Sequence, residues 1–412
     1  MRVEAGFILA RLEWWAVDTQ RLSLRSGFVW TAAGNLVNAA TQWLVLALLA
    51  RAGSAELLGQ WALALALSAP VAMMAHLNLR TLLATDVAGE HPFTDYLRVR
   101  HLSNAAAIAV LLAIALHAGW PVLLLGCAIL TDNTSDVLYG AMQRAERLDS
   151  VAQSMMTRSL LSVALVGAAL LFRADALSAS AGYLSGRLIT LCLIDWPRSR
   201  DSMPAQPARR PWKVLLTSLP LGFSLLLISL SVNVPRYAIE RHGGSRELGA
   251  FAAVTAFVAA GTTVVNALGQ SATTRLAAAF QTGNRPAFRK LTFSLLLSVV
   301  VIGGLGVLLA ELAGGSILAL IYSPAFAAHA PLLVACLAAG VALWVAQALG
   351  FAASAMRAFK PQLPVLAAMC AVSALVSFGA VPRWGLYGAA MAMAASGLAG
   401  AAGQLAILRR AL

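Results

Sequence analysis

Charged residues are scarce in this chain, and their scarcity excludes an ordinary soluble domain. Asp, Glu, Lys and Arg make up 11% of the 412 residues, and 60% are hydrophobic. Soluble domains carry about 25% charged residues. Apolar runs recur along the whole sequence, and each has the roughly 17–25 residues that a membrane-spanning helix needs. The composition predicts an all-α, polytopic membrane protein.

Cysteine is also scarce, and its spacing is not that of a metal site. Cys127, Cys192, Cys336 and Cys370 all lie inside apolar runs, where cysteine packs as a small apolar residue. The outside loops are short and gather no set of catalytic side chains, which an enzyme would need at one place. We expect no metal, no cofactor, no catalytic residue and no enzymatic activity.

Twelve apolar runs are candidate membrane spans. By residue number they cover approximately 28–50, 59–79, 102–118, 120–141, 155–172, 176–194, 214–237, 248–270, 290–311, 328–352, 361–380 and 384–408. The run 120–141 is the weakest because the polar segment 131–136 interrupts it. Without this run, the charges of successive loops would no longer alternate.

The net charge of +13 could indicate a nucleic-acid partner, but its distribution indicates a membrane orientation instead. With both termini in the cytoplasm, 23 of the 30 Lys and Arg residues are inside, and such a bias sets topology. We therefore expect cytoplasmic termini and no nucleic acid. The exceptions are Arg187, within a span, and six outside arginines, namely Arg51, Arg173, Arg236, Arg241, Arg246 and Arg383.

The N-terminus does not have the pattern of a cleavable signal. Its apolar stretch is interrupted by Arg11, and no small-residue cleavage site follows. Apolar residues at helical spacing predict an interfacial helix over residues 3–18. A misplaced start codon is the alternative.

A linker divides the chain into two halves of six spans each. Residues 195–213 are rich in Pro, Ser and Arg, which is typical of a solvated connection. We expect a six-helix lobe over residues 1–205 and a second over 206–412. The segment 51–61, RAGSAELLGQW, aligns without gaps on 241–251, RHGGSRELGAF, and MQRAER (142–147) aligns more weakly on AMRAFK (355–360). Equivalent places with equal orientation predict parallel repeats related about the membrane normal.

Polar residues line one face of several spans. In the first span Thr31, Asn35, Asn38 and Gln42 recur at helical spacing. Such stripes either join helices by hydrogen bonds or line a water-filled cavity; whole stripes in both halves favour the cavity. The candidate substrate-binding residues are Asn35, Asn38, Gln42, Asp132, Asp136, Arg187, Asn233, Asn266 and Gln270, with Arg236 at the outer mouth and Arg275 at the inner face.

Asp132 and Arg187 lie at similar depth, near the middle of their spans. An isolated charge there costs at least about 2.5–3.5 kcal/mol. The two residues either form a structural ion pair, or Arg187 faces the cavity and binds an anionic group while Asp132 or Asp136 titrates.

The stretch 219–280 resembles the seventh and eighth spans of the polysaccharide-biosynthesis, O-antigen-type flippases, within the multidrug, oligosaccharidyl-lipid and polysaccharide exporter superfamily. The resemblance lies in Pro220, in the run from Asn233 to Tyr237 (NVPRY), in Leu248-Gly249-Ala250-Phe251, and in residues 267–280. It implies a MATE-like fold that translocates polyprenyl-pyrophosphate-linked sugars across the bacterial plasma membrane by alternating access. The first span lacks the acidic residue that cation-coupled members often carry, which weakens a drug-exporter interpretation.

The sequence thus predicts a flippase or exporter of a lipid-linked oligosaccharide or polysaccharide precursor. Its expected partners are that substrate, membrane lipids and glycan-assembly proteins. A multidrug/cation antiporter of the same fold is the first alternative, and a membrane-embedded glycan polymerase or transferase is the second.

Overall fold

A computed structural model describes residues 24–86, 89–202 and 207–411, and the regular elements within these ranges are all helical. The interfacial helix expected over residues 3–18 lies outside them. Ten of the helices are long and apolar enough to cross a membrane. The expectation of a polytopic all-α membrane protein is confirmed.

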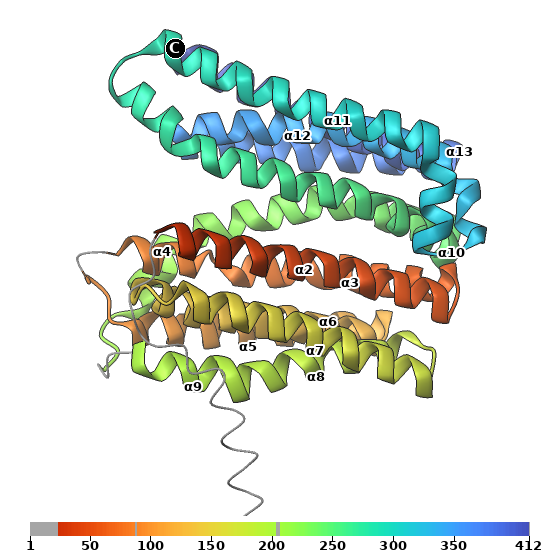
Figure 1. Cartoon of the computed structure of the whole chain (residues 1–412), viewed down its shortest axis with the longest axis horizontal. Coiled ribbons are helices and arrows are strands. Elements are labelled where there is room, and N and C mark those ends of the chain that lie inside the picture. The colour runs from red at the N-terminus through yellow and green to blue at the C-terminus, as the bar shows by residue number, and fades with distance from the viewer. Residues whose placement is uncertain (1–23, 87–88, 203–206, 412) are drawn as a thin grey trace, which may run out of the picture.

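The first half of the chain supplies a group of helices that lies together in the lower part of Figure 1. A π-helical turn (Leu191–Asp195) and a 3-10 turn (Arg200–Ser202) flank the last short helix. The α-helices are α2 (Leu24–Ala52), α3 (Ala55–His76), α4 (Leu79–Thr85), α5 (Phe93–Ala118), α6 (Trp120–Arg144), α7 (Leu148–Phe172), α8 (Ala176–Thr190) and α9 (Trp196–Ser199).

The second half forms the upper part of Figure 1, where α10 lies between the first group and α11–α13. A short 3-10 helix (Pro324–His329) precedes α12. The helices are α10 (Pro211–Gln281), α11 (Arg285–Ile321), α12 (Ala330–Ala355) and α13 (Phe359–Ala411).

Two glycines break the longest helices. Gly244 in α10 has φ 76° and ψ 178°, and Gly385 in α13 has φ 54° and ψ −130°. Residues with a Cβ rarely adopt such positive φ values, whereas glycine does so readily. At Gly244 the chain turns, and α10 runs to one end of the molecule and back (Figure 1). Counting α10 and α13 as two segments each gives the twelve spans that the sequence predicts.

Local sequence explains where several helices begin. Ser54 caps α3 by accepting the backbone N–H of Leu57, and Asp175 caps α8 by accepting that of Ser178 at 2.7 Å. Asn284 does the same for α11. Such side chains satisfy N–H groups that have no partner inside the helix.

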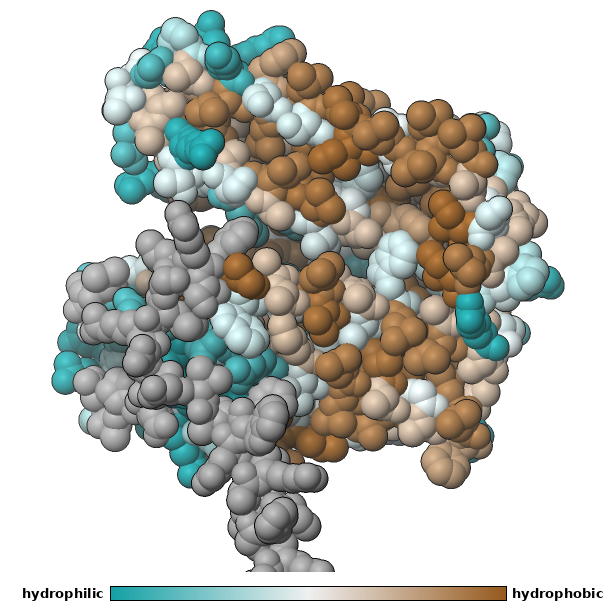
Figure 2. All heavy atoms as spheres, viewed as in Figure 1, coloured by the Kyte–Doolittle hydropathy of each residue, from teal (hydrophilic) through white to brown (hydrophobic). Residues whose placement is uncertain are grey.

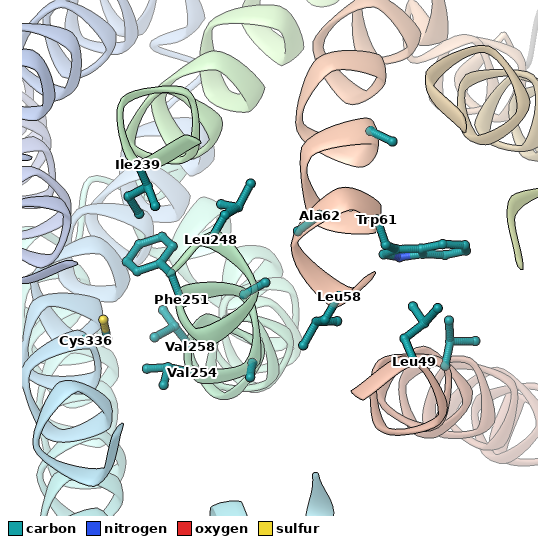
Figure 3. Close-up of a cluster of buried hydrophobic side chains, with 14 of the residues drawn as sticks. Leu49, Leu58, Trp61, Ala62, Ile239, Leu248, Phe251, Val254, Val258 and Cys336 are labelled. Atoms are coloured by element: carbon teal, nitrogen blue, oxygen red, sulfur yellow. The ribbon is translucent and has the colours of Figure 1, made fainter. Parts of the chain in front are cut away.

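The core joins the two groups of helices. Leu49, Leu58 and Trp61 from α2 and α3 are buried in the same apolar cluster as Phe251 and Val254 of α10 (Figure 3). Around it, Figure 2 shows a hydrophobic band across the middle of the visible face, with hydrophilic residues mostly toward the two ends. This arrangement suits a bilayer, whose hydrocarbon is about 30 Å thick.

Three charged residues lie where the sequence analysis did not expect them. Arg100 and Arg158 were counted with cytoplasmic cations, but both are buried inside the bundle. Asp195 was expected to begin the solvated linker, but it is fully buried and accepts hydrogen bonds from Ser135, Tyr139 and Ser154. In each case hydrogen-bond or ion-pair partners offset the cost of burying the charge.

Candidate functional site

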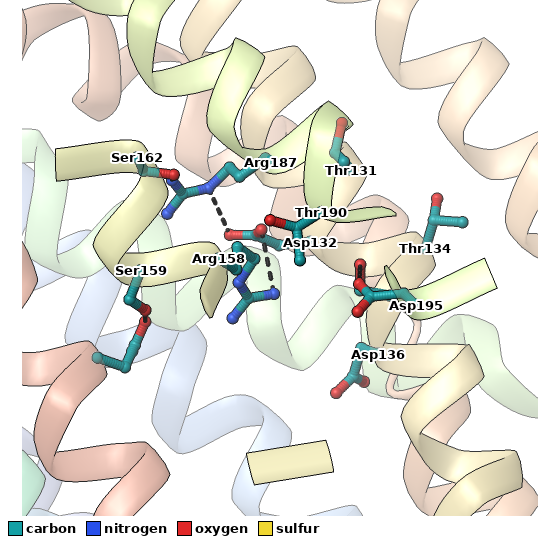
Figure 4. A network of polar contacts seen from close by, with 12 residues as sticks. Thr131, Asp132, Thr134, Asp136, Arg158, Ser159, Ser162, Arg187, Thr190 and Asp195 are labelled. Carbon is teal, nitrogen blue, oxygen red and sulfur yellow. Dashed lines mark hydrogen bonds and ion pairs between the residues drawn. The ribbon is translucent and has the colours of Figure 1, made fainter. Parts of the chain in front are cut away.

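Asp132 of α6 lies between two arginines in the interior of the first group of helices (Figure 4). Its Oδ1 is 3.1 Å from Nη1 of Arg158 on α7, and its Oδ2 is 3.0 Å from Nε of Arg187 on α8. The ion pair with Arg187, one of the two alternatives drawn from the sequence, is therefore present. The second arginine was not anticipated.

Arg187 is held on every side of its guanidinium. Besides Asp132, its NH1 donates to Oγ of Ser162 at 2.8 Å and its NH2 to the hydroxyl of Tyr183 at 2.5 Å. The guanidinium also lies 3.5 Å from the centre of the Tyr183 ring, close enough for a cation–π contact. Arg187 is thus fixed in one orientation.

Asp132, Arg158 and Arg187 together hold one negative and two positive charges, and the buried carboxylate of Asp195 lies within electrostatic reach of Arg158. One carboxylate faces two guanidinium groups, and arginine keeps its charge in proteins. Among the described residues, the buried Nε of Arg158 has no hydrogen-bond partner. A buried donor without a partner costs about 1–3 kcal/mol, so this nitrogen would gain from an acceptor such as an anionic oxygen.

A small polar pocket opens beside Arg187. Asn38 and Gln42 of α2 line it together with Ser159, Ser162 and Tyr183, and its volume is about 10 Å³. Such a volume holds about one water molecule. The Oδ1 of Asn38 accepts a hydrogen bond from Ser159 at 3.0 Å, whereas Asn35, one turn earlier on α2, is exposed.

Asp136 belongs to a separate cluster, one turn along α6. Its carboxylate lies 3.1 Å from Arg80 and 3.4 Å from Nε2 of His76. Arg80 also donates from two nitrogens to Oε1 of Gln143, each at 3.1 Å. Both aspartates of the α6 stripe are therefore neutralised by basic neighbours.

In the second half the polar stripes make contacts within that half. Asn233 is buried and accepts a hydrogen bond from Arg236 at 3.1 Å. Asn266 accepts from Gln347 of α12 at 2.5 Å. Gln270 and Arg275 are exposed.

The structure brings Asn38, Gln42 and Arg187 to one pocket and holds Asp132 beside it. It leaves Asp136 in the adjacent cluster and the second-half candidates elsewhere. Arg158, Gln347 and His76 were missed as members of these clusters. Arg158 is three residues into its predicted span, so it was grouped with loop cations. Among the described residues, no group of His, Cys, Asp and Glu could hold a metal ion.

No protein-family model matches the chain. The capsular polysaccharide biosynthesis protein CapF of Staphylococcus aureus is 22% identical over 302 residues, which cover 72% of this chain and 76% of CapF.

Solved structures share the fold. The lipid II flippase MurJ in an inward closed conformation has a TM-score of 0.71 at 12% identity, covering 92% of this chain and 87% of that one. A multidrug resistance MATE family transporter of the MOP superfamily, in an inward-facing conformation, has a TM-score of 0.67 at 14% identity, covering 92% and 94%. The chain therefore has the fold of MATE transporters and of a lipid II flippase and is similar in sequence to a polysaccharide biosynthesis protein, in agreement with its resemblance to the polysaccharide flippases.

Proposed function

We propose that this chain is a flippase or exporter of the bacterial plasma membrane that translocates a polyprenyl-pyrophosphate-linked oligosaccharide or polysaccharide precursor. The observation that carries the proposal is the surplus positive charge of Asp132, Arg158 and Arg187 beside a polar pocket. A pyrophosphate suits arginine, whose planar fork can hold two oxygens at once. The similarity to CapF and the fold of MurJ support the same class.

Translocation would proceed by alternating access of the two lobes, residues 1–205 and 206–412, with both termini in the cytoplasm. At about 10 Å³ the pocket beside Arg187 is far too small for a pyrophosphate. Entry of the substrate must therefore separate α2 from α7 and α8. An anion arriving there would accept from the free Nε of Arg158 and replace Ser162 or Tyr183 on Arg187.

A multidrug/cation antiporter is the second candidate, and the fold shared with MATE transporters supports it. A cation-coupled mechanism needs a carboxylate that is free to bind the ion. Asp132 and Asp136 each face two basic side chains, which favours the flippase. A glycan polymerase or transferase is the least supported, since the sequence of the short outside loops gathers no set of catalytic side chains.

The deciding experiment measures translocation in vesicles reconstituted with the purified protein. A lipid-linked oligosaccharide with a fluorescent sugar is scored by its accessibility to an added lectin. We expect Arg187→Gln and Arg158→Gln to reduce the rate about tenfold or more, the equivalent of one charge-assisted hydrogen bond. The control is Arg173→Gln, since Arg173 is an exposed arginine paired with Asp175 between α7 and α8.

Two outcomes would overturn the proposal. In the first, both variants translocate at the wild-type rate at equal protein content. In the second, the wild-type protein moves a cationic dye but leaves the glycolipid in place, which would select the antiporter.

A further inference from the structure

A groove of about 350 Å³ runs between α11, α12 and α13 on the second half of the protein. Its walls are mostly apolar, and Phe293 and Leu405 within it are 67% and 39% exposed. Two arginines, Arg289 and Arg409, complete the lining.

The two arginines lie at the same end of the groove. Arg289 is in the second turn of α11, which begins at Arg285, and Arg409 is in the last turn of α13, which ends at Ala411. Phe293 and Leu405 are each one turn further from these helix ends, at about 1.5 Å per residue. The groove is therefore basic at its mouth and apolar deeper in. Its mouth is at the end of the bundle that the loop charges place in the cytoplasm.

The charge around this mouth has no acidic counterpart nearby. Between residues 248 and 412 the sequence has a single acidic residue, Glu311, which lies toward the opposite end of α11. The side chains of Arg289 and Arg409 have no ion pair or hydrogen bond within the described part of the chain. The inner end of this half instead gathers eight cations: Arg275, Arg285, Arg289, Lys290, Arg357, Lys360, Arg409 and Arg410.

We propose that this groove binds an anionic phospholipid of the cytoplasmic leaflet. The phosphate lies between Arg289 and Arg409, and one acyl chain follows Phe293, Leu296 and Leu405 into the bilayer. Unpaired basic residues at a membrane surface attract anionic lipid with about 1 kcal/mol each. The same walls without the arginines would favour no particular headgroup.

Position favours a resident lipid over the transported glycolipid. Figure 1 places α11 on the side of the molecule away from α2–α9, and α11 packs mainly on α10, α12 and the 3-10 helix before α12. Arg51 of α2 bonds to α11 at Leu320 and Ile321, at the opposite end of the helix from the groove. The groove is therefore remote from the cluster of Arg158 and Arg187. The inference does not rest on the proposed function, because a transporter of any substrate could hold such a lipid.

The test measures lipid binding to the full chain by native mass spectrometry after delipidation in detergent. Phosphatidylglycerol and phosphatidylcholine are titrated separately onto the wild-type protein and onto Arg289→Gln/Arg409→Gln. We expect one phosphatidylglycerol to bind the wild-type protein at least tenfold more tightly than phosphatidylcholine, and the double variant to lose this preference. Arg285→Gln/Arg410→Gln is the matched control, since it removes two neighbouring arginines that do not line the groove.

Three results would overturn the inference. The double variant could keep the wild-type preference, or the control could lose as much, which would indicate diffuse surface charge. Alternatively, a polyprenyl diphosphate could displace the bound phosphatidylglycerol at equal concentration, which would assign the groove to the carrier lipid. Phe293→Ala leaves both arginines in place and tests the apolar wall. We expect it to weaken the binding of phosphatidylglycerol and of phosphatidylcholine by the same factor.

Discussion

Gly59 of α3 and Gly249 of α10 lie against each other, and the contact is the same in both directions. A Cβ on Gly59 would overlap the carbonyl oxygen of Ser245 and come within 3.0 Å of the Gly249 nitrogen. A Cβ on Gly249 would overlap the carbonyl oxygen of Ala55 and come within 3.0 Å of the Gly59 nitrogen. Ala55 aligns with Ser245, and Gly59 with Gly249, in the repeated segments 51–61 and 241–251. The repeat therefore meets itself across an approximate two-fold axis.

This glycine contact is expected to control how closely the two halves approach at the end of the bundle that holds the turn between α2 and α3. Gly59→Val should force α3 and α10 apart there, because backbone atoms occupy the space of the new side chain. Spin labels at Glu56→Cys and Arg246→Cys, in a chain without its four natural cysteines, report the separation by pulsed electron resonance. We expect a longer and broader distance distribution in the valine variant.

Gly306 of α11 supplies the control, since a Cβ there would meet nothing within 4 Å. Gly306→Val should leave the label distance unchanged. An unchanged distance in Gly59→Val as well, in a protein that remains folded, would show that the glycine contact does not set the separation.

Arg51 joins the two halves beside the glycine contact. Its Nε donates to the carbonyl oxygens of Ile321 and Tyr322, each at 3.1 Å, and its NH2 to that of Leu320. These carbonyls end α11, where a cation is favourable. Arg51→Gln should weaken closure of this end by about 0.5–2 kcal/mol, read as a larger population with a long distance between the same labels. Arg241, its partner in the repeat, is exposed and makes no such bond in the described chain, so an equal effect of Arg241→Gln would contradict the assignment.

The number and type of spans could be predicted because a bilayer imposes the length of an apolar helix. The ends of the helices could not be predicted. Helices continue beyond the hydrocarbon, and there their composition no longer differs from that of loops. The ninth span was expected over 290–311, but α11 runs over Arg285–Ile321. The spans expected over 214–237 and 248–270 leave residues 238–247 as their connection, and Gly244 provides the turn there.

Contacts in the interior could be predicted only where two residues lie at the same depth in the membrane, as counted along their spans. Counting residues placed Asp132 and Arg187 at one level, and they pair. The pairing of Asn266 with Gln347 could not be found in this way. Gln347 is a lone polar residue in an apolar run, and only the packing of α12 on α10 brings the two amides together. Whether the candidate residues bind substrate stays a prediction.

Arg100 is expected to stabilise the end of α3. It is fully buried and donates to the carbonyl oxygens of Ala75 and His76 at 2.6 and 2.7 Å. The chain then turns through left-handed conformations at Leu77 and Asn78, with φ 53° and 49°, which are costly for residues with a Cβ. Arg100→Met should lower the free energy of unfolding by about 1–3 kcal/mol, because two buried carbonyls lose their donor. Thermal unfolding in detergent measures this, and a loss as large for the exposed Arg98→Met would contradict it.

Asp86 should make stability depend on pH in the acid range. Burial disfavours its charged form, but the N–H groups of Glu90 and His91 and the hydroxyl of Tyr96 together hold its pKa below the ordinary value. A lowered folded-state pKa adds stability above the ordinary pKa of about 3.9, and this is lost as pH falls through the folded value. Asp86→Asn should therefore be less stable near pH 7, with the difference from wild type shrinking toward pH 3. A difference from wild type that stays constant between pH 7 and pH 3 would rule this out.

The charge balance of the interior cluster predicts an order of stability among its variants. Asp132→Asn leaves Arg158 and Arg187 facing each other without a carboxylate, and should cost about 3 kcal/mol or more. Arg187→Gln leaves one ion pair and should cost less. The double variant Asp132→Asn/Arg158→Gln restores the original net charge and should recover part of the stability lost in Asp132→Asn alone. Chemical unfolding of the wild-type protein, Asp132→Asn, Arg158→Gln and the double variant gives the double-mutant cycle for Asp132 and Arg158. Additive effects would mean that Asp132 and Arg158 do not interact. The cluster of Asp132, Arg158 and Arg187, on which the anion-binding proposal depends, would then not exist as described.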